Sequence, residues 1–314
     1  SIPKEVTILD EANLTFLPKS IKNPVEVENE RIAHIKDGVA LTKFICWLKK
    51  NVGKIPITEL SAGEKLYSFR AQQENFIDNS FDPIISYGIH AAINHYSATP
   101  ETDIAIEPGN FLLADTGGHY YEGTTDTTRT IVMGSVNDEQ KKYFTAVLRG
   151  MLNLGNAKFR YGCTGVNLDY LARGPLWEMG QDFNHGTGHG VGYLLNVHEG
   201  PNSFRWRIIQ GDNAVLEEGM ITSDEPGYYV ENQYGIRHEN LLVCKKAEKT
   251  SFGQFMCFEH LTMVPFDLDA VVPELMTMQE RALLNSYHAQ VYKNISPYLE
   301  EEEKEWLKEA TREI

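Results

Sequence analysis

Residues 110–133 read NFLLADTGGHYYEGTTDTTRTIVM, two apolar strand-like runs on either side of a glycine-rich turn. Each run carries one aspartate near its inner end, Asp115 and Asp126. A turn between Tyr120 and Tyr121 predicts that these aspartates lie opposite each other, about 5 Å apart on one face of a hairpin. Two carboxylates at so short a distance repel each other unless they are protonated or joined by a cation. Taken alone, each aspartate is more simply interpreted as a turn or cap residue.

The same arrangement recurs in residues 220–243, MITSDEPGYYVENQYGIRHENLLV. Here Glu225 and Glu239 are equidistant from Asn232, in the middle of a turn-forming stretch. This repetition weakens the interpretation of the acids as turn residues. Since helices are expected before each hairpin, the pattern indicates two similar αβ halves, although the hairpins share little identity beyond the acids.

Four converging carboxylates require positive charge, and hard cations that prefer oxygen ligands supply it most simply. Residues 183–201, FNHGTGHGVGYLLNVHEGP, place His185, His189 and His198 in one glycine-rich stretch. A single histidine is more often structural than ligating. Three in such a stretch favour function, and His189 is the expected nitrogen ligand.

Composition restricts the class of protein. The 314 residues predict one large domain with an appendage, and the net charge of -15 argues against nucleic-acid binding. No apolar run approaches the roughly 18 residues of a membrane span. The four cysteines lack CxxC spacing, which disfavours a zinc knuckle or disulfide scaffold and fits a reducing compartment. The first residues lack the features of a secretory signal. Because the chain begins with Ser1 and has no initiator Met, we expect a fragment of a longer protein.

Hydrophobic spacing and capping signals outline the elements. Helices are expected over residues 26–52 and 165–179. Three more are expected to begin at pairs with capping-box spacing: Ser61/Glu64, with the helix running to 73, Asn137/Gln140, with the helix running to 159, and Thr277/Glu280. Strands are expected at 83–89, 111–116, 127–133, 220–222 and 241–244. We therefore divide the chain into a linker at 1–24, a catalytic domain at 25–258 and a helical extension at 259–314, whose charged end is a solvated face.

With these motifs the chain resembles a known family, the pita-bread metallopeptidases, and among them the cytosolic type of aminopeptidase P. The resemblance covers about residues 25–314. The motifs that carry it are LLADTGGHYYEGTTDTTRT, HGTGHGVGYLLNVHEGP, SDEPGYY and YGIRHENL, with FRAQQENF and INHY upstream. It implies an α+β pita-bread fold, with pseudo-twofold duplicated αβ halves around a curved antiparallel sheet and a C-terminal helical extension.

The resemblance also implies a dinuclear site. Its ligands carry over to Asp115, Asp126, His189, Glu225 and Glu239, with Asp126 and Glu239 bridging two divalent ions, usually Mn²⁺. The implied reaction is peptide hydrolysis by a hydroxide that bridges the metals, with Glu225 accepting its proton.

Further residues of the site carry over from the same motifs. His198 matches a histidine that stabilises the oxyanion, and His95 one that binds substrate and shuttles protons. His185 lines the site, and Arg237 with Tyr229 orients Asp115. The simpler interpretations are an ordinary ion pair for Arg237 and surface histidines for His95 and His198.

Members of the family release the first residue from peptides with proline in the second position, so we expect such peptides as substrates. A homodimer in the cytoplasm is implied, with no nucleic-acid or membrane partner. Cytosolic members carry two further domains before this one. The alternatives are prolidase, methionine aminopeptidase, a non-catalytic pita-bread binding module and a metal-free relative of the creatinase kind, the last two requiring altered ligands.

Overall fold

The computed structural model describes residue 3, residues 6–7 and residues 13–314, so the predicted linker lies partly outside the described residues. The helices are α1 Phe16–Ser20, α2 Pro24–Asn51, α3 Glu59–Arg70, α4 Asp138–Gly155, α5 Tyr170–Trp177, α6 Met278–Ile295 and α7 Glu301–Ala310. The strands are β1 Phe76–Asn79, β2 Ile84–Tyr87, β3 Asn110–Thr116, β4 Gly118–Tyr120, β5 Gly123–Thr124, β6 Thr127–Met133, β7 Lys158–Arg160, β8 Gly188–His189, β9 Ser203–Phe204, β10 Ile221–Asp224, β11 Gly227–Val230, β12 Tyr234–Arg237, β13 Asn240–Thr250 and β14 Gly253–His260.

These elements fall into two similar halves. In the first, α2 and α3 precede a sheet of order β2-β3-β6. In the second, α4 and α5 accompany a sheet of order β10-β13-β14-β7, of which only β7 comes before α5 in the chain. All strand pairs within the described residues are antiparallel. The mixed helices and antiparallel sheets, repeated twice, agree with the predicted α+β class.

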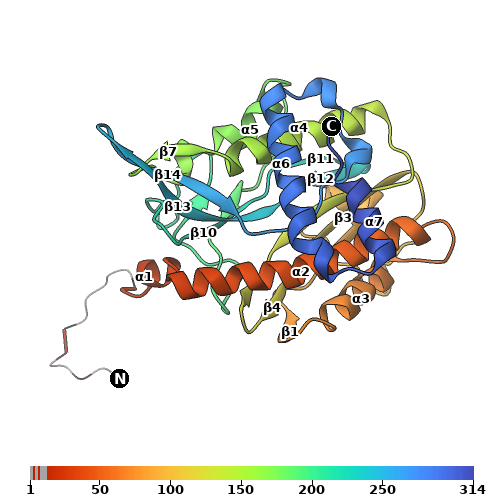
Figure 1. Ribbon diagram of the computed structural model, residues 1–314, viewed down its shortest axis with the longest axis horizontal. Helices are drawn as coiled ribbons and strands as arrows, with labels where there is room; N and C mark the ends of the chain where they lie inside the picture. The colour runs from red at the N-terminus through yellow and green to blue at the C-terminus, as the bar shows by residue number, and fades with distance from the viewer. Residues whose placement is uncertain (1–2, 4–5, 8–12) are drawn as a thin grey trace.

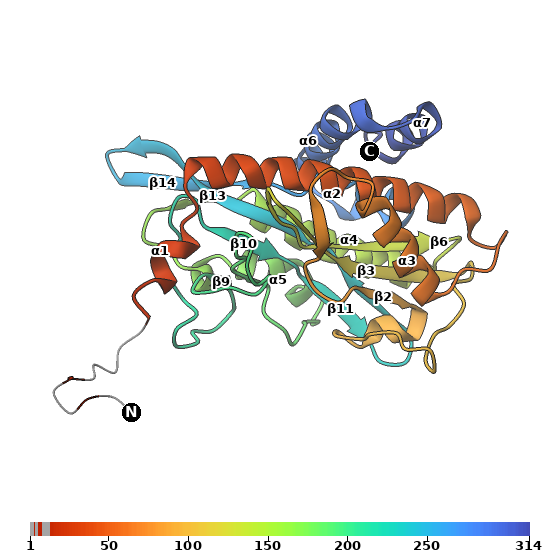
Figure 2. The same cartoon turned by 90° about the horizontal axis from the view of Figure 1, so that it is seen from below.

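The long helix α2 lies along one side of the strands, and α6 and α7 pack next to it (Figure 1, Figure 2). Apolar residues of this C-terminal part, among them Leu284, Val291 and Ile295, are fully buried in the same core as Phe111 and Phe144. Burying each side chain of this size contributes about 1.5–3 kcal/mol. The helical extension is therefore part of the central core rather than an appendage on its surface.

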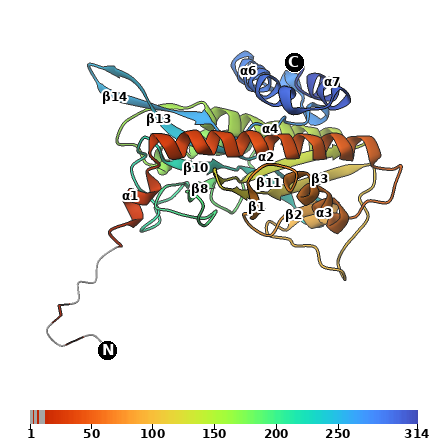
Figure 3. The ribbon, with the colours of Figure 1, turned by 60° about the horizontal axis from the view of Figure 1, so that its bottom comes forward.

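Strand lengths in the second half differ from those predicted. β13 continues to Thr250 instead of ending near Cys244, and β14, which had no counterpart in the prediction, pairs with it. Figure 3 shows this β13–β14 hairpin extending away from the body of the molecule. The outer half of β13 is mostly exposed and charged, so this part of the strand lacks the apolar alternation by which a strand is recognised.

The start of α3 corrects one prediction. The capping box is formed by Thr58 and Ser61, whose side chains each accept a hydrogen bond from the backbone of the other, and not by Ser61 and Glu64. The helix therefore starts three residues earlier than the spacing of Ser61 and Glu64 suggested, because Thr58 has the extended backbone that an N-cap requires.

The start of α6 confirms the predicted capping box of Thr277 and Glu280. Thr277 Oγ1 accepts a hydrogen bond from Glu280 N at 3.1 Å, and Glu280 Oε2 accepts one from Thr277 N at 2.8 Å. Replacing Thr277 with Ala is expected to lower the free energy of unfolding by about 1 kcal/mol, the usual contribution of an N-cap. Urea unfolding followed by circular dichroism measures this change, and an unchanged midpoint would contradict it.

In the described part of the chain, none of the helices combines the length and the apolar character that a bilayer crossing requires.

Candidate metal centre

The first acidic hairpin has a register that differs from the prediction. Asp115 on β3 pairs with Thr128 on β6, so the turn is centred between Tyr121 and Glu122. The predicted direct pairing of Asp115 with Asp126 is therefore wrong by two residues. Because side chains alternate faces with a period of two, an offset of two leaves both aspartates on the same face of the hairpin.

The second acidic hairpin has the predicted register. Asp224 pairs with Asn240 in one ladder and Gly227 with Arg237 in the next, so Glu225 and Glu239 lie opposite each other between the two ladders. Asn232 occupies the turn with φ of 57°, a left-handed conformation that asparagine tolerates better than most residues.

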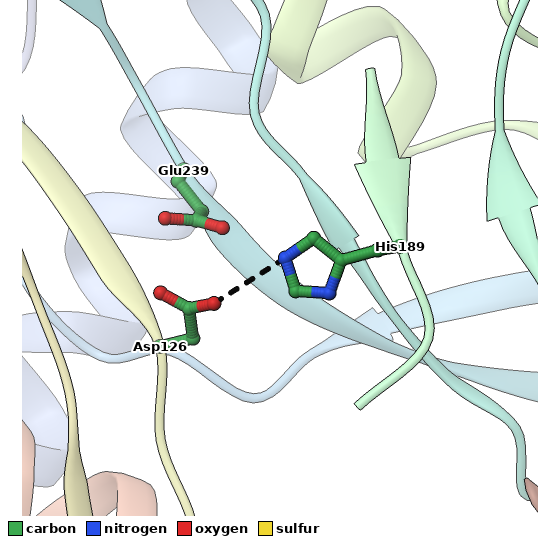
Figure 4. A group of neighbouring side chains, drawn as sticks. All are labelled: Asp126, His189 and Glu239. Atoms are coloured by element: carbon green, nitrogen blue, oxygen red, sulfur yellow. Dashed lines mark ion pairs between the residues drawn. The ribbon is translucent and has the colours of Figure 1, made fainter. Parts of the chain in front are cut away.

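The acids of the two hairpins meet around His189. Ligand atoms of Asp126, His189 and Glu239 all lie within 4.8 Å of one another (Figure 4). His189 Nε2 is 3.5 Å from Asp126 Oδ2 and 3.4 Å from Glu225 Oε1. Asp115 is the fifth member of the predicted ligand set, and it lines the same cavity.

Glycine at position 188 makes this approach possible. A Cβ at Gly188 would lie 1.8 Å from the carbonyl oxygen of Ser223, so only glycine lets β8 lie so close to β10. His189 N then donates to Ser223 Oγ at 3.0 Å, and Ser223 Oγ donates to Glu225 Oε1 at 3.2 Å. The backbone contact thus brings the imidazole of His189 beside Glu225.

Asp115 is held by a buried guanidinium. Arg237 Nη2 donates to Asp115 Oδ2 at 2.6 Å, and Arg237 Nη1 donates to the hydroxyl of Tyr229 at 2.7 Å. The same hydroxyl lies 2.9 Å from His185 Nε2. Asp115 Oδ1 is buried and has no hydrogen-bond partner among the described residues, so a ligand atom of this carboxylate remains available.

A cavity of about 570 Å³ opens over these side chains. It is lined by the five predicted ligands and by His95, His185, His198 and Arg237. Tyr229 lies outside this lining, in contact with Arg237 and His185. Arg205 also lines the cavity and forms an ion pair with Asp212 at 2.5 Å. No sequence motif indicated that Arg205 belongs to this lining.

The surroundings of the centre shift the pKa values of its ionisable side chains. Burial, together with the neighbouring carboxylates, raises the pKa of Glu239 well above its usual range, and burial likewise raises that of Asp126. Burial works to lower the pKa of His189, but Asp126 and Glu225 outweigh it and raise the pKa to about 9. Burial therefore disfavours the charged forms of Glu239 and Asp126, while the nearby carboxylates favour the charged form of His189.

The donor set fits divalent cations. Four carboxylates and one imidazole converge, and among the described residues of the cavity Arg237 contacts only one of the acids, Asp115. Oxygen ligands with a single nitrogen suit hard or borderline ions such as Mn²⁺ and Zn²⁺. The unpartnered Asp115 Oδ1 and the raised carboxylate pKa values both agree with a site built around metal ions.

Comparison with protein families gives two matches. Residues 28–246 match the model of metallopeptidase family M24, and residues 254–314 match the model of the C-terminal region of peptidase M24. Among curated proteins, a probable Xaa-Pro aminopeptidase P from Paracoccidioides brasiliensis (strain Pb03) is 43% identical over 303 residues, covering 94% of this chain and 49% of that protein. Aminopeptidase P1 from Arabidopsis thaliana is 39% identical, covering 95% and 50%. The chain therefore spans about half the length of these relatives.

Solved structures agree with these matches. X-prolyl aminopeptidase from Caenorhabditis elegans, described as a cytosolic enzyme with a di-nuclear active site, is similar with a TM-score of 0.91 and 37% identity. The match covers 96% of this chain and 50% of that one. Xaa-Pro dipeptidase from Bacillus anthracis has a TM-score of 0.66 and 29% identity, covering 81% and 65%. The likeness confirms the predicted pita-bread fold with its C-terminal helical part.

Proposed function

Since this chain belongs to metallopeptidase family M24, we propose that it is the catalytic part of a Xaa-Pro aminopeptidase. Such an enzyme is a metallo-exopeptidase that releases the first residue from peptides with proline in the second position. The identities to aminopeptidases P from a fungus and a plant support this assignment. Residues 25–258 form the catalytic domain, 259–314 the helical extension and 1–24 a linker.

Two divalent ions complete the site in this proposal. Asp115, Asp126, His189, Glu225 and Glu239 hold them, and the carboxylate-rich set favours Mn²⁺. When bound, the ions polarise the scissile carbonyl and lower the pKa of the attacking water. The di-nuclear active site described for the Caenorhabditis elegans enzyme supports two ions rather than one.

Glu225 accepts the proton of the attacking water in this proposal. Burial raises the pKa of Glu225, with Asp126 and Asp115 adding to the effect, and a raised pKa suits a group that must take and return a proton near neutral pH. Glu225 lines the cavity, and the 3.2 Å hydrogen bond from Ser223 Oγ orients its carboxylate.

The remaining histidines act on the substrate. Burial and the neighbouring His189 lower the pKa of His198 to about 4, so its imidazole is neutral at pH 7 and donates a hydrogen bond to the oxyanion. His95 lines the cavity and contacts the substrate. Burial lowers the pKa of His185 to about 3, and its contact with Tyr229 keeps it oriented as a neutral wall of the site.

Arg237 and Tyr229 orient the ligand Asp115. The 2.6 Å contact engages Asp115 Oδ2, while Oδ1 has no hydrogen-bond partner among the described residues and would be the oxygen that binds a metal ion. Guanidinium and carboxylate pair with high geometric specificity, which suits a group that must fix a ligand without competing for both oxygens.

The observation that carries the proposal is the convergence of Asp126, His189 and Glu239 within 4.8 Å in the cavity. Treatment with a chelator is expected to abolish hydrolysis of Arg-Pro-Pro, and Mn²⁺ is expected to restore it. Elemental analysis of the restored protein is expected to find about two ions per chain. Failure to bind any metal at neutral pH would overturn the proposal.

Prolidase is the competing function, since a Xaa-Pro dipeptidase shares the fold over 81% of this chain. The two activities separate on substrate length. The proposal predicts cleavage of Arg-Pro-Pro in preference to Gly-Pro and to a Met-Gly peptide. Preferential cleavage of either of the latter substrates would reassign the chain to prolidase or to methionine aminopeptidase.

A cytoplasmic homodimer completes the proposal. The description of the Caenorhabditis elegans enzyme as cytosolic supports the location. Sedimentation equilibrium of the purified chain tests the dimer, and a mass of one chain across the concentration range would contradict it.

A further inference from the structure

Arg129 on β6 is a buried cation that the proposed reaction does not use. Its side chain is 1% exposed, and it lies three residues after the ligand Asp126. Its guanidinium donates to neutral oxygens: Pro265 O at 3.2 Å, Thr128 O at 2.9 Å, Glu239 O at 2.6 Å, Asn240 Oδ1 at 2.7 Å, Val264 O at 2.8 Å and Tyr287 Oη at 3.0 Å. In the described part of the chain it has no carboxylate partner, which is unusual for a buried arginine.

One of these contacts reaches a proposed metal ligand through its main chain. Arg129 Nη1 binds Glu239 O, while Glu239 N donates to Thr128 O at 3.1 Å. Thr128 Oγ1 also donates to Glu239 Oε2 at 2.8 Å. Glu239 is therefore tied to β6 through its carbonyl, its amide and its carboxylate. Since β6 follows Asp126 directly, these bonds fix the ligands of one hairpin relative to those of the other.

The guanidinium is itself held by the C-terminal helical part. Tyr287 on α6 accepts from Arg129 at 3.0 Å, and its hydroxyl proton is directed to Val264 O or Thr262 O, at 2.8 and 2.9 Å. Phe266 stacks beneath the guanidinium, with 4.0 Å between its ring centroid and Arg129 Cζ. The plane of the guanidinium is thus set by residues that follow the two αβ halves in sequence.

We infer that Arg129 and Tyr287 are positioning residues for the metal centre, and that through them α6 is part of the frame that fixes Glu239 between the two hairpins. The inference rests on the proposed metal centre. It assigns the C-terminal helical part a role in metal affinity in addition to its apolar packing.

A contrast between two tyrosines of α6 tests this inference. Tyr287 and Tyr292 are both packed against the central core, but the hydroxyl of Tyr292 makes no hydrogen bond within the described residues. The 314-residue chain is freed of metal with a chelator and then titrated with Mn²⁺ by calorimetry. The titration compares the wild type with Tyr287→Phe and Tyr292→Phe. We expect Tyr287→Phe to weaken Mn²⁺ binding about 10-fold, the lower end for losing a residue that supports a ligand, and Tyr292→Phe to bind as wild type does.

The visible absorption spectrum of the cobalt-loaded proteins gives a readout that general destabilisation would not change. A shifted spectrum is expected for Tyr287→Phe and the wild-type spectrum for Tyr292→Phe, since only the first alters the ligand geometry. Arg129→Lys keeps the charge but loses the planar set of donors, and it is expected to show weakened binding and a shifted spectrum as well.

Two results would count against different claims. Wild-type affinity and spectrum in both Tyr287→Phe and Arg129→Lys would overturn the inference while leaving the proposed function intact. A wild-type chain that binds neither Mn²⁺ nor Co²⁺ would instead overturn the proposed metal centre from which the inference starts.

Discussion

Replacing Glu225 with Gln is expected to lower kcat on Arg-Pro-Pro by about 10²- to 10⁴-fold, the usual contribution of a positioned general base. Glutamine has nearly the same shape but cannot accept a proton at neutral pH. Its amide oxygen still accepts the hydrogen bond from Ser223 Oγ, which is 3.2 Å from the carboxylate in the native chain. The loss should therefore appear in turnover while the chain remains folded.

Glu231 provides the matched control. It lies exposed near the tip of the same hairpin, next to Asn232, so Glu231→Gln makes the same chemical change away from the cavity. Wild-type kcat is expected for Glu231→Gln, and similar thermal melting is expected for both variants. If Glu225→Gln retained near-native turnover with bound metal, another group would have to be the base.

The two hairpins show which part of the site could be predicted from sequence. The turn of the second is centred on Asn232, a residue type that accepts positive φ, and its register followed from the sequence alone. The turn of the first is placed by distant residues, since Glu122 Oε1 accepts from Lys36 Nζ at 2.8 Å and from Asn75 Nδ2 at 2.7 Å. Symmetry about the two aspartates could not reveal those contacts, and the register prediction was wrong by two residues.

Local sequence signals also could not predict that the two hairpins contact each other. Thr130 Oγ1 donates to Arg237 O at 2.9 Å and accepts from Arg237 N at 3.0 Å, across 107 residues of chain. The two acidic hairpins and the glycine-rich histidine stretch indicated five candidate ligands, and the resemblance to a known family implied the same five. The structure supplied the bonds that join the two hairpins. Arg129 and Tyr287 were missed because they act through backbone carbonyls, which leave no pattern of charged residues in the sequence.

The start of α3 was missed because two overlapping sequence signals compete there. The spacings Thr58/Ser61 and Ser61/Glu64 both resemble a capping box, and the acidic residue at the third helical position favoured the Ser61/Glu64 pair. The extended backbone at Thr58 decides between them, and it depends on the isolated bridge that pairs Thr58 with Ala105. A long-range contact thus selects the weaker of the two sequence signals.

Replacing Asp126 with Asn is expected to have the second large effect, because it removes a carboxylate from the point where the two hairpins meet. Metal affinity should fall by more than the roughly 10- to 100-fold that follows loss of a residue that merely supports a ligand. The metal content after dialysis should fall below that of the wild type, and hydrolysis of Arg-Pro-Pro should be lost with it. Inductively coupled plasma analysis and the peptide assay measure both.

Asp224 is the appropriate control for this change, since it is a fully buried aspartate beside the same centre but outside the proposed ligand set. Burial, with Glu225 and Asp169 adding to the effect, raises the pKa of Asp224 well above its usual range, which favours the neutral form of its carboxyl group. Asp224→Asn changes the group very little in shape at a position outside the proposed ligand set, and metal content should be retained. Equal metal loss in both variants would mean that the centre responds to any change in this part of the core, and Asp126 would lose its assignment as a ligand.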